Sequence, residues 1–434
     1  MIKSLHPSLL WQRLFLFSCF IGATVHGSVV AFGRPGRFRD FDFHRDFGAH
    51  FLSGEYLYSN AYLYPYMPSA AMFFAPLALL DRDLGIFLRY SVAVCALLIS
   101  LVFLQRMVES RHSKKINGLI PGILTVVLTL QFILYDLDDG GPQLILTGML
   151  VAGIYFVWKG SEKGGALWFG LAIALKVSPA LFVPFFIWKR LWRLAGYTIL
   201  AAMFWVALPI VWMGSSNWWA HQKVWFETAA GSAVGITTWH TLDNVQRVRN
   251  QALRPALMRY LVTYPENHPI RKDDPAYWPL LDLPTGVADT IGIVATVALL
   301  SIFCWYTRHP YRTPQDSNWV KECSGVMIIT LLISPMAWIQ HLPWILPGLY
   351  VIIATIFVKK CIGRPTFAAL GGYLLLTVIL NYEFIGKQNF QVLLSYHPFT
   401  IAMLLVLGIL LFSRNLAYVS GETGASHSPQ RLGT

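Results

Sequence analysis

Long apolar segments recur along this chain, and they limit the folds that it can adopt. Apolar residues make up 55% of the sequence and charged residues 13%, about half of the ~25% that soluble proteins usually carry. A run of roughly 17 or more apolar residues is long enough for a helix to cross a bilayer. The sequence therefore predicts an all-α polytopic membrane protein. We expect spans near 13–33, 84–105, 119–135, 142–158, 195–213, 286–306, 322–338, 342–358, 366–382 and 398–413.

Segment 164–188 is also apolar, but a single crossing would carry Lys189, Arg190 and Arg193 to the outer side. Lys and Arg favour the cytoplasmic side, and Pro179 interrupts a helix. We therefore expect a hairpin of two short helices with its turn near the outer side. With this hairpin, the chain has about twelve predicted spans.

The charge pattern predicts the topology. The net charge is +12, but Lys and Arg lie in short clusters between apolar segments, the strongest at 106–115. Such clusters stay in the cytoplasm, which puts both termini inside and the loops 34–83 and 214–284 outside. The basic charge suits anionic membrane lipid better than nucleic acid. We expect one transmembrane module, residues 1–414, and a disordered cytoplasmic tail, 415–434.

The first outer loop holds the densest polar sequence. Its stretches 41–58 and 69–80 are too short to cross a bilayer, and we expect helices at the interface. Carboxylates beside several arginines should stay ionised, because positive charge lowers their pKa; this suits a general base. Alternatively, the loop is solvated and anchors the first span at the headgroups. The carboxylates are Asp40, Asp42 and Asp46.

The loop pattern from Asp40 through Gly54 and Tyr58, followed by Y64-P-Y-M-P68, resembles glycosyltransferase family 87, whose members are polyprenyl-phosphate-dependent membrane enzymes. The resemblance implies a GT-C glycosyltransferase fold, with interfacial helices in two long outer loops. By its spacing to Gly54 and Tyr58, Asp40 matches the catalytic base of the family. Asp42 is the other candidate.

Two further stretches resemble motifs of this family. The turn D138-D-G-G-P-Q143 is similar to a G-Q-x-N element, and makes Gln143 a candidate, although Asn is absent here. The stretch L175-K-V-S-P179 is similar to an L-K-x-x-P element and makes Lys176 a candidate for binding the donor phosphate. A charge within an apolar hairpin is a functional candidate; the alternative is a lysine that extends to the headgroups.

The loop segment 247–259 resembles an N-Q-S-L element that ends in Arg. On a helix, Asn250, Arg254 and Met258 would share one face. Basic and amide side chains there could hold a phosphate, which Arg binds in a bidentate manner. Alternatively, a basic amphipathic helix rests on anionic lipid. The candidates for binding the donor phosphate are Asn250, Gln251, Arg254 and Arg259.

The stretch S334-P-M-A-W-I-Q-H-L-P-W344 resembles an S-P-x-x-W-x-H-H element. Gln340 replaces the first histidine, so His341 alone remains. It could donate a hydrogen bond to a departing phosphate, or it could be structural.

Together these resemblances imply an enzyme that moves one sugar, mannose being the first expectation, from a β-linked polyprenyl phosphate to a lipid-linked or glycan acceptor. The transfer would invert the linkage at the extracytoplasmic face of the inner (plasma) membrane. Asp40 would be the base, with Lys176, Arg259 and His341 on the leaving-group side, and neither metal nor cofactor is expected. The alternatives are a lipid-carrier flippase or transporter, and a ligase or polymerase that uses polyprenyl-diphosphate glycans.

Overall fold

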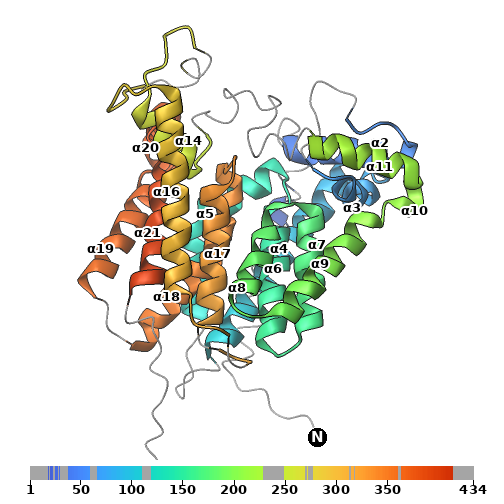
Figure 1. The fold of residues 1–434 in the computed structure, drawn as a ribbon, viewed down its shortest axis with the longest axis horizontal. Helices are drawn as coiled ribbons and strands as arrows, with labels where there is room; N and C mark the ends of the chain where they lie inside the picture. The colour runs from blue at the N-terminus through green and yellow to red at the C-terminus, as the bar shows by residue number, and fades with distance from the viewer. Residues whose placement is uncertain are drawn as a thin grey trace, which may run out of the picture.

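The structure of the protein, a computed structural model, is helical throughout the part that it describes (Figure 1). No β-strand occurs in that part, which confirms the all-α expectation. Most of the first predicted span and all of the predicted tail lie outside it. The described residues are 38–58, 66–109, 119–227, 249–268, 277–311, 314–316, 318–359 and 363–413, with Arg271 and several positions between 18 and 29.

The described helices coincide with the remaining predicted spans. They are α4 (Arg82–Glu109), α5 (Leu119–Asp139), α6 (Gln143–Trp158), α7 (Glu162–Leu175), η1 (Ser178–Leu181), α8 (Phe182–Trp188), α9 (Trp192–Ala207), α10 (Ile210–Met213), α16 (Thr285–Tyr306), α17 (Trp319–Ile333), η3 (Ile339–Ile345), α18 (Leu346–Lys359), α19 (Arg364–Leu374), η4 (Leu375–Ile379) and α21 (Pro398–Phe412).

Within the described residues, 5 helices are long and apolar enough to cross a membrane, or 6 if the bent pair Arg364–Ile379 and Tyr382–Leu394 forms one span. The protein is thus a multi-pass membrane protein. Other predicted spans, α6 and α21 among them, form shorter apolar helices. The count of twelve therefore stays a prediction.

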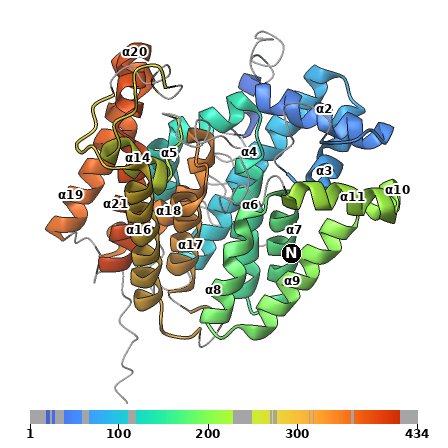
Figure 2. The same ribbon diagram turned by 45° about the horizontal axis from the view of Figure 1, so that its top comes forward.

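Further helices gather at one end of the bundle, which we call the loop face (Figures 1 and 2). Two of them match the interfacial helices expected in the first outer loop, and they pack against each other. The last, α20, follows a bend of 93° and was not predicted. These helices are α2 (Arg39–Ser53), α3 (Pro68–Ala78), α11 (Ser215–Trp225), α14 (Leu253–Leu261) and α20 (Tyr382–Leu394).

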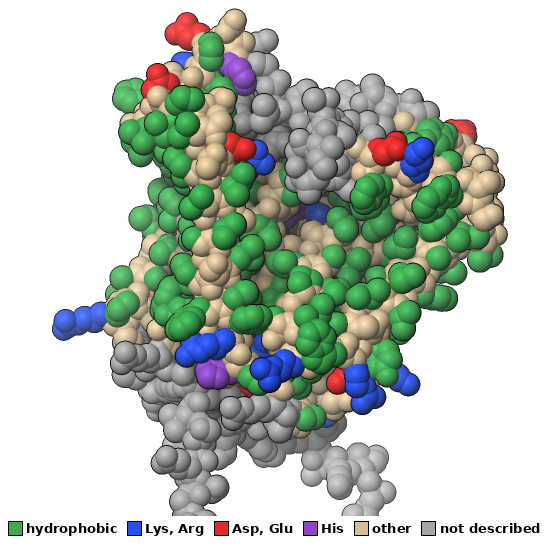
Figure 3. Space-filling view, viewed as in Figure 1, with side chains coloured by type: hydrophobic (Ala, Val, Ile, Leu, Met, Phe, Trp, Pro, Cys, Tyr) green, Lys and Arg blue, Asp and Glu red, His purple; other side chains and the backbone are tan. Residues whose placement is uncertain are grey.

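The segment after α6 forms the predicted hairpin. The backbone leaves the helical conformation at Lys176, where α7 ends, and η1 and α8 return. Both ends of the hairpin meet the same short segment: the Gln315 N–H donates to the Trp158 carbonyl (3.0 Å), and the Tyr311 N–H donates to the Lys189 carbonyl (3.3 Å). Lys189 is therefore back at the end where α7 begins. We call this end the basic face, because Lys and Arg side chains gather there (Figure 3).

A buried ion pair closes the basic face. Lys189 Nζ lies 2.8 Å from Glu322 Oε2, and the two side chains are only 3% and 8% exposed. The ammonium also donates to the carbonyls of Thr307 and His309. Since these partners come from α17 and from the turn that joins α16 to α17, the pair joins the hairpin to the second half of the chain.

Replacing Lys189 with Met should destabilise the protein by about 3–5 kcal/mol, because it leaves the Glu322 carboxylate buried without a counter-charge. The double variant Lys189→Met/Glu322→Leu should recover much of this loss. Thermal unfolding in detergent, followed by tryptophan fluorescence, measures both. Arg193→Ala is the control, because its pair with Glu162 is exposed, and it should change little. Equal destabilisation by the single and double variants would contradict the role of the pair.

Candidate functional site

Asp40 lies in the first turn of α2, and the turn between α5 and α6 fixes the start of that helix. The Phe38 N–H donates to the Asp138 carbonyl at the end of α5, next to this turn (3.0 Å). Gly141 faces the carboxylate, since a Cβ there would lie 3.2 Å from Asp40 Oδ2. Gly140, at φ +82°, faces Phe41 so closely that a Cβ would lie 2.5 Å from its Cβ. The two glycines therefore make room for α2.

A buried ion pair holds the same turn in place. Arg89 of α4 and Asp136 of α5 are 2% and 0% exposed, and Nη2 lies 3.1 Å from Oδ2. Arg89 also donates to the Gly141 carbonyl. The Asp136 carboxylate accepts from the N–H groups of Gln143 and Leu144, each at 3.1 Å, and so caps the start of α6. Gln143 takes part through its backbone; a role for its side chain stays a prediction.

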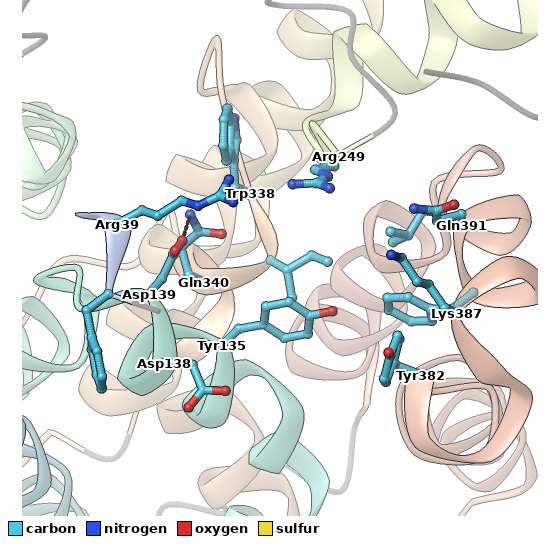
Figure 4. Close-up of a pocket in the computed structure, with 14 residues that line it drawn as sticks. Arg39, Tyr135, Asp138, Asp139, Arg249, Trp338, Gln340, Tyr382, Lys387 and Gln391 are labelled. Carbon is cyan, nitrogen blue, oxygen red and sulfur yellow. Dashed lines mark hydrogen bonds between the residues drawn. The ribbon is translucent and has the colours of Figure 1, made fainter. Parts of the chain in front are cut away.

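Gln340 connects the two carboxylates at the mouth of the site. Its Nε2 donates to Asp139 Oδ2 at 2.9 Å (Figure 4), and its side chain also forms a hydrogen bond with Asp40. Gln340 stands at the start of η3, which packs against α5. The base candidate is therefore held from both sides, by the glycine turn and by η3.

Burial raises the pKa of Asp40 above its ordinary value of 3.8. The hydrogen bond with Gln340 and the positive charges of Lys176 and Arg89 act in the opposite direction but are smaller effects. The expectation that nearby positive charge keeps this pKa low is therefore wrong in sign. A raised pKa brings the carboxylate closer to the value that suits a general base at neutral pH.

Lys176 and His341 lie side by side, with 3.3 Å between Nζ and Nε2. Lys176 is at the tip of the hairpin and His341 is in η3. The Trp338 N–H donates to Nδ1 of His341 (3.3 Å), which directs Nε2 toward the lysine. The positive charge of Lys176 also acts on Asp40. The structure thus brings Lys176, His341 and Asp40, from three distant segments, into one site.

Asp42 is engaged elsewhere. Arg82 at the start of α4 binds it through two hydrogen bonds, Nε to Oδ1 and Nη2 to Oδ2, each 2.8 Å long. Because α2 is helical, residues two apart point in different directions. Asp40 faces the α5–α6 turn, whereas Asp42 faces the start of α4.

His44 lies one helical turn after Asp40 and is also buried. Its ring stacks on Phe74 of α3, with 4.2 Å between the centroids and 13° between the planes. Burial, together with the charges of Lys176 and Arg89, lowers the pKa of His44 to about 3. The imidazole is therefore neutral, and it serves to pack α2 on α3.

Asn250 and Gln251 fasten loops to one another. The Asn250 amide donates to the Pro335 carbonyl (2.8 Å) and accepts from the Ala337 N–H (2.9 Å). Gln251 binds backbone groups of Leu394 and Phe399. The helix α14 starts at Leu253, so the expectation that Asn250 shares a helical face with Arg254 is wrong. The Asn250 amide therefore supports the segment that carries His341, whereas the Gln251 amide joins the end of α20 to the start of α21. Direct contact with phosphate stays a prediction for both.

The two arginines of this segment point to different neighbours. Arg259 is buried, and its guanidinium lies 4.3 Å from the ring centroid of Tyr277 and 5.4 Å from that of Tyr396. Arg254 forms an ion pair with Asp289 of α16 on the exposed side. The structure therefore does not bring Arg254 to Lys176 and His341. Roles in phosphate binding stay predictions for both arginines.

The space around the site has two parts. Figure 3 shows a hollow in the side of the molecule, lined by apolar side chains, with histidine and basic side chains at its bottom. On the loop face, a pocket of about 350 Å³ is lined by Asp139, Gln340 and residues of α20 (Figure 4). The apolar hollow suits a lipid chain, and the pocket on the loop face suits a polar group.

The sequence profile of glycosyltransferase family 87 matches residues 62–335, more than half of the chain. The chain belongs to glycosyltransferase family 87. One similar protein is a polyprenol-phosphate-mannose-dependent alpha-(1-2)-phosphatidylinositol mannoside mannosyltransferase of Mycolicibacterium smegmatis, which is 23% identical over 71% of this chain and 66% of the relative. Another is the corresponding pentamannoside enzyme of Mycobacterium tuberculosis, which is 22% identical over 73% of this chain and 63% of the relative. The chain thus spans just under two thirds of their length. No solved structure matches it.

This family 87 member has site residues that the sequence interpretation did not select. Arg89, Asp136 and Asp139 come from spans or their ends, and Gln340 was noted only as the residue replacing a histidine of the family motif. A charged residue inside an apolar span is the signal that could have found Arg89, because lipid offers it no counter-ion. Its partner depends on how α4 packs against the end of α5, which motifs do not encode.

Replacing Gly140 with Ala should impair the site more than the fold. The left-handed conformation costs a non-glycine residue about 1–2 kcal/mol, and the new Cβ would displace Phe41 and with it Asp40. Since a shift of ~1 Å can cost about 100-fold in rate, we expect sugar transfer to fall by at least tenfold. Activity and melting temperature of the purified variant measure this. In the control Gly371→Ala, the new Cβ meets nothing within 4 Å and should leave activity unchanged; normal transfer by Gly140→Ala would contradict the docking role.

Proposed function

We propose that this protein is a membrane mannosyltransferase that transfers one mannosyl residue from polyprenol-phosphate-mannose to an acceptor hydroxyl, with inversion at the anomeric carbon. The single observation that carries the proposal is that Asp40 is bound by Gln340, which lines the polar pocket, and lies within reach of the charge of Lys176, which is paired with His341. The names of the relatives support mannose and a polyprenol phosphate carrier. They also name phosphatidylinositol mannosides, which suggests a lipid-linked acceptor.

In the proposed step, Asp40 accepts the proton of the acceptor hydroxyl while the hydroxyl oxygen forms a bond to the anomeric carbon. The bond between that carbon and the phosphate oxygen breaks, and polyprenyl phosphate leaves with the electron pair. The β-linked donor gives an α-linked product because attack comes from the face opposite the phosphate. Free Asp40 is regenerated when the proton passes to solvent.

Lys176 and His341 are proposed to stabilise the departing phosphate, whose negative charge grows as the bond breaks. Their nitrogens are 3.3 Å apart, so one phosphate group could contact both. No group of three or more His, Cys, Asp or Glu side chains within the described residues could hold a metal ion. Metal independence stays a prediction. Without a metal ion, Lys176 and His341 would supply the positive charge.

The apolar hollow is the proposed route for the prenyl chain, since it opens on the side of the bundle that lipid would surround (Figure 3). The basic face would be cytoplasmic, because Lys and Arg clusters favour that side. The loop face, with Asp40, would then be extracytoplasmic, in the plasma membrane, and both termini would be inside.

Asp40→Asn should reduce transfer by roughly 10²–10⁴-fold, because an amide of the same shape cannot accept the proton. Donor binding should survive, since the base faces the acceptor. Asp42→Asn is the matched control: its carboxylate is bound by Arg82, and we expect an effect within about tenfold, or ~1.4 kcal/mol on the barrier. Assays use purified protein, polyprenol-phosphate-mannose and a panel of lipid acceptors.

The same assay separates the rival functions. Movement of intact donor across a reconstituted bilayer, without release of polyprenyl phosphate, would favour a flippase. Use of diphosphate-linked glycans alone would favour a ligase or polymerase. Normal transfer by Asp40→Asn would remove Asp40 from the mechanism.

The rate of transfer should also depend on the protonation of Asp40. As pH falls through its raised pKa, the base becomes protonated and the rate should fall; as pH rises, the rate should reach a plateau. Gln340→Leu removes a hydrogen bond that lowers this pKa, so the acid limb should move to higher pH. Measuring kcat/KM against pH tests this, with Lys223→Ala as a control. An acid limb that stays in place would contradict the coupling of Gln340 to Asp40.

A further inference from the structure

The pocket on the loop face has features that the transfer chemistry alone does not require. Its volume of about 350 Å³ falls within the roughly 300–1,000 Å³ of small-molecule sites. Its walls come from the start of α2, the end of α5, the segment before α14, and α20. Figure 4 shows the side chains of these separate segments around one space.

Three basic side chains line this pocket. Arg39 lies near Asp139, and the positive charge of Arg39 acts on the Asp139 carboxyl. Arg249 and Lys387 form no ion pair with any described carboxylate, and both side chains line the same space (Figure 4). Two cations that face the same cavity, and that have no counter-ion within the part of the chain that the structure describes, favour an anionic ligand, which Arg binds in a bidentate manner. Asp138 and Tyr135 add groups that bind hydroxyls.

The wall formed by α20 depends on a break in that helix. Gly386 has φ 76° and ψ 167°, a conformation that is essentially restricted to glycine. The break comes directly before Lys387. After it, Lys387 and Gln391 are four residues apart on one helical face, and both line the pocket. This wall also lies beyond residues 62–335, the part matched by the family profile.

The pocket adjoins the base. Gln340 and Asp139 line it, and Gln340 forms a hydrogen bond with Asp40. A ligand bound by Arg249 and Lys387 would therefore have its other end at Gln340, next to the carboxylate. This is the arrangement that an acceptor needs: an anchor at one end and a hydroxyl at the base.

We propose that this pocket binds the acceptor, and that the acceptor has a hydroxyl-rich headgroup carrying a phosphate or similar anionic group. The inference rests on the proposed function, and it adds the charge of the acceptor and the residues that select it. Arg249 and Lys387 bind the anion, and the hydroxyls point toward Asp139 and Gln340.

The test compares Arg249→Ala and Lys387→Ala with Lys223→Ala, a control that removes an exposed lysine of α11. Binding of inositol 1-phosphate and of inositol to the purified protein is measured by calorimetry. Each pocket variant should weaken binding of the phosphate about 10- to 100-fold, and the control should not. Weak binding of inositol should be the same in all variants. Equal binding of the phosphate by all proteins, or no binding by the wild type, would overturn the proposal.

Transfer assays with lipid-anchored and water-soluble acceptors distinguish the source of the anion. With an anionic acceptor, Lys387→Ala should raise the acceptor KM at least tenfold and leave the donor KM unchanged. If Asp40→Asn keeps full activity while these effects persist, the proposed mechanism fails but the pocket stands. If Asp40→Asn is inactive while the pocket variants keep the normal acceptor KM, only the pocket assignment fails. Use of phosphatidylinositol lipid but not inositol 1-phosphate would identify a lipid headgroup.

Discussion

The buried pair between Arg89 and Asp136 is the interaction on which the site depends. Removing two charges from water costs several kcal/mol per ion, and this is offset only where further hydrogen bonds satisfy both groups. Here Asp136 also caps α6, and Arg89 also binds backbone carbonyls. The pair thereby fixes the turn of Gly140 and Gly141, against which α2 docks. A membrane helix, a helix cap and the base candidate are thus connected through one carboxylate.

The same burial decides the chemistry available to Asp40. A carboxylate near two cations would be strongly acidic in water, but loss of solvent favours the neutral form more than these charges oppose it. The outcome is a carboxylate that is easily protonated and still close to Lys176. The two sides of a displacement reaction, proton acceptance and leaving-group stabilisation, can then occur within one desolvated space.

The sequence was sufficient to predict the features that depend on residues close together in the chain. Apolar runs located the helices of the bundle, from α4 to α9, from α16 to α19, and α21. The three basic residues at 189, 190 and 193 predicted the hairpin, because Lys and Arg favour the cytoplasmic side. Motif spacing selected Asp40, Lys176 and His341, which the structure brings together. It could not supply the pairing of Arg89 with Asp136, or the link from Gln340 to Asp139, since these join residues 47 and 201 positions apart.

Two other differences have physical causes. The pKa of Asp40 was expected to be low because the arginines near it are visible in the sequence, whereas its burial is not. The helix α20 was not predicted because polar residues and Gly386 interrupt its apolar pattern. Asn250 and Gln251 looked like ligands because amides bind phosphate, yet the same groups satisfy the backbone of buried loops.

The short hairpin also sets the depth of the site. The helix α7 has 14 residues, so it rises only ~21 Å from the basic face, whereas the hydrocarbon layer is ~30 Å thick. In the orientation that we propose, Lys176 at its tip would be recessed by about 10 Å from the far headgroups. A carrier phosphate would then have to leave the headgroup layer to reach Lys176, and an acceptor would have to enter from the loop face. Transfer would thus take place below the water surface, where hydrolysis competes least with it.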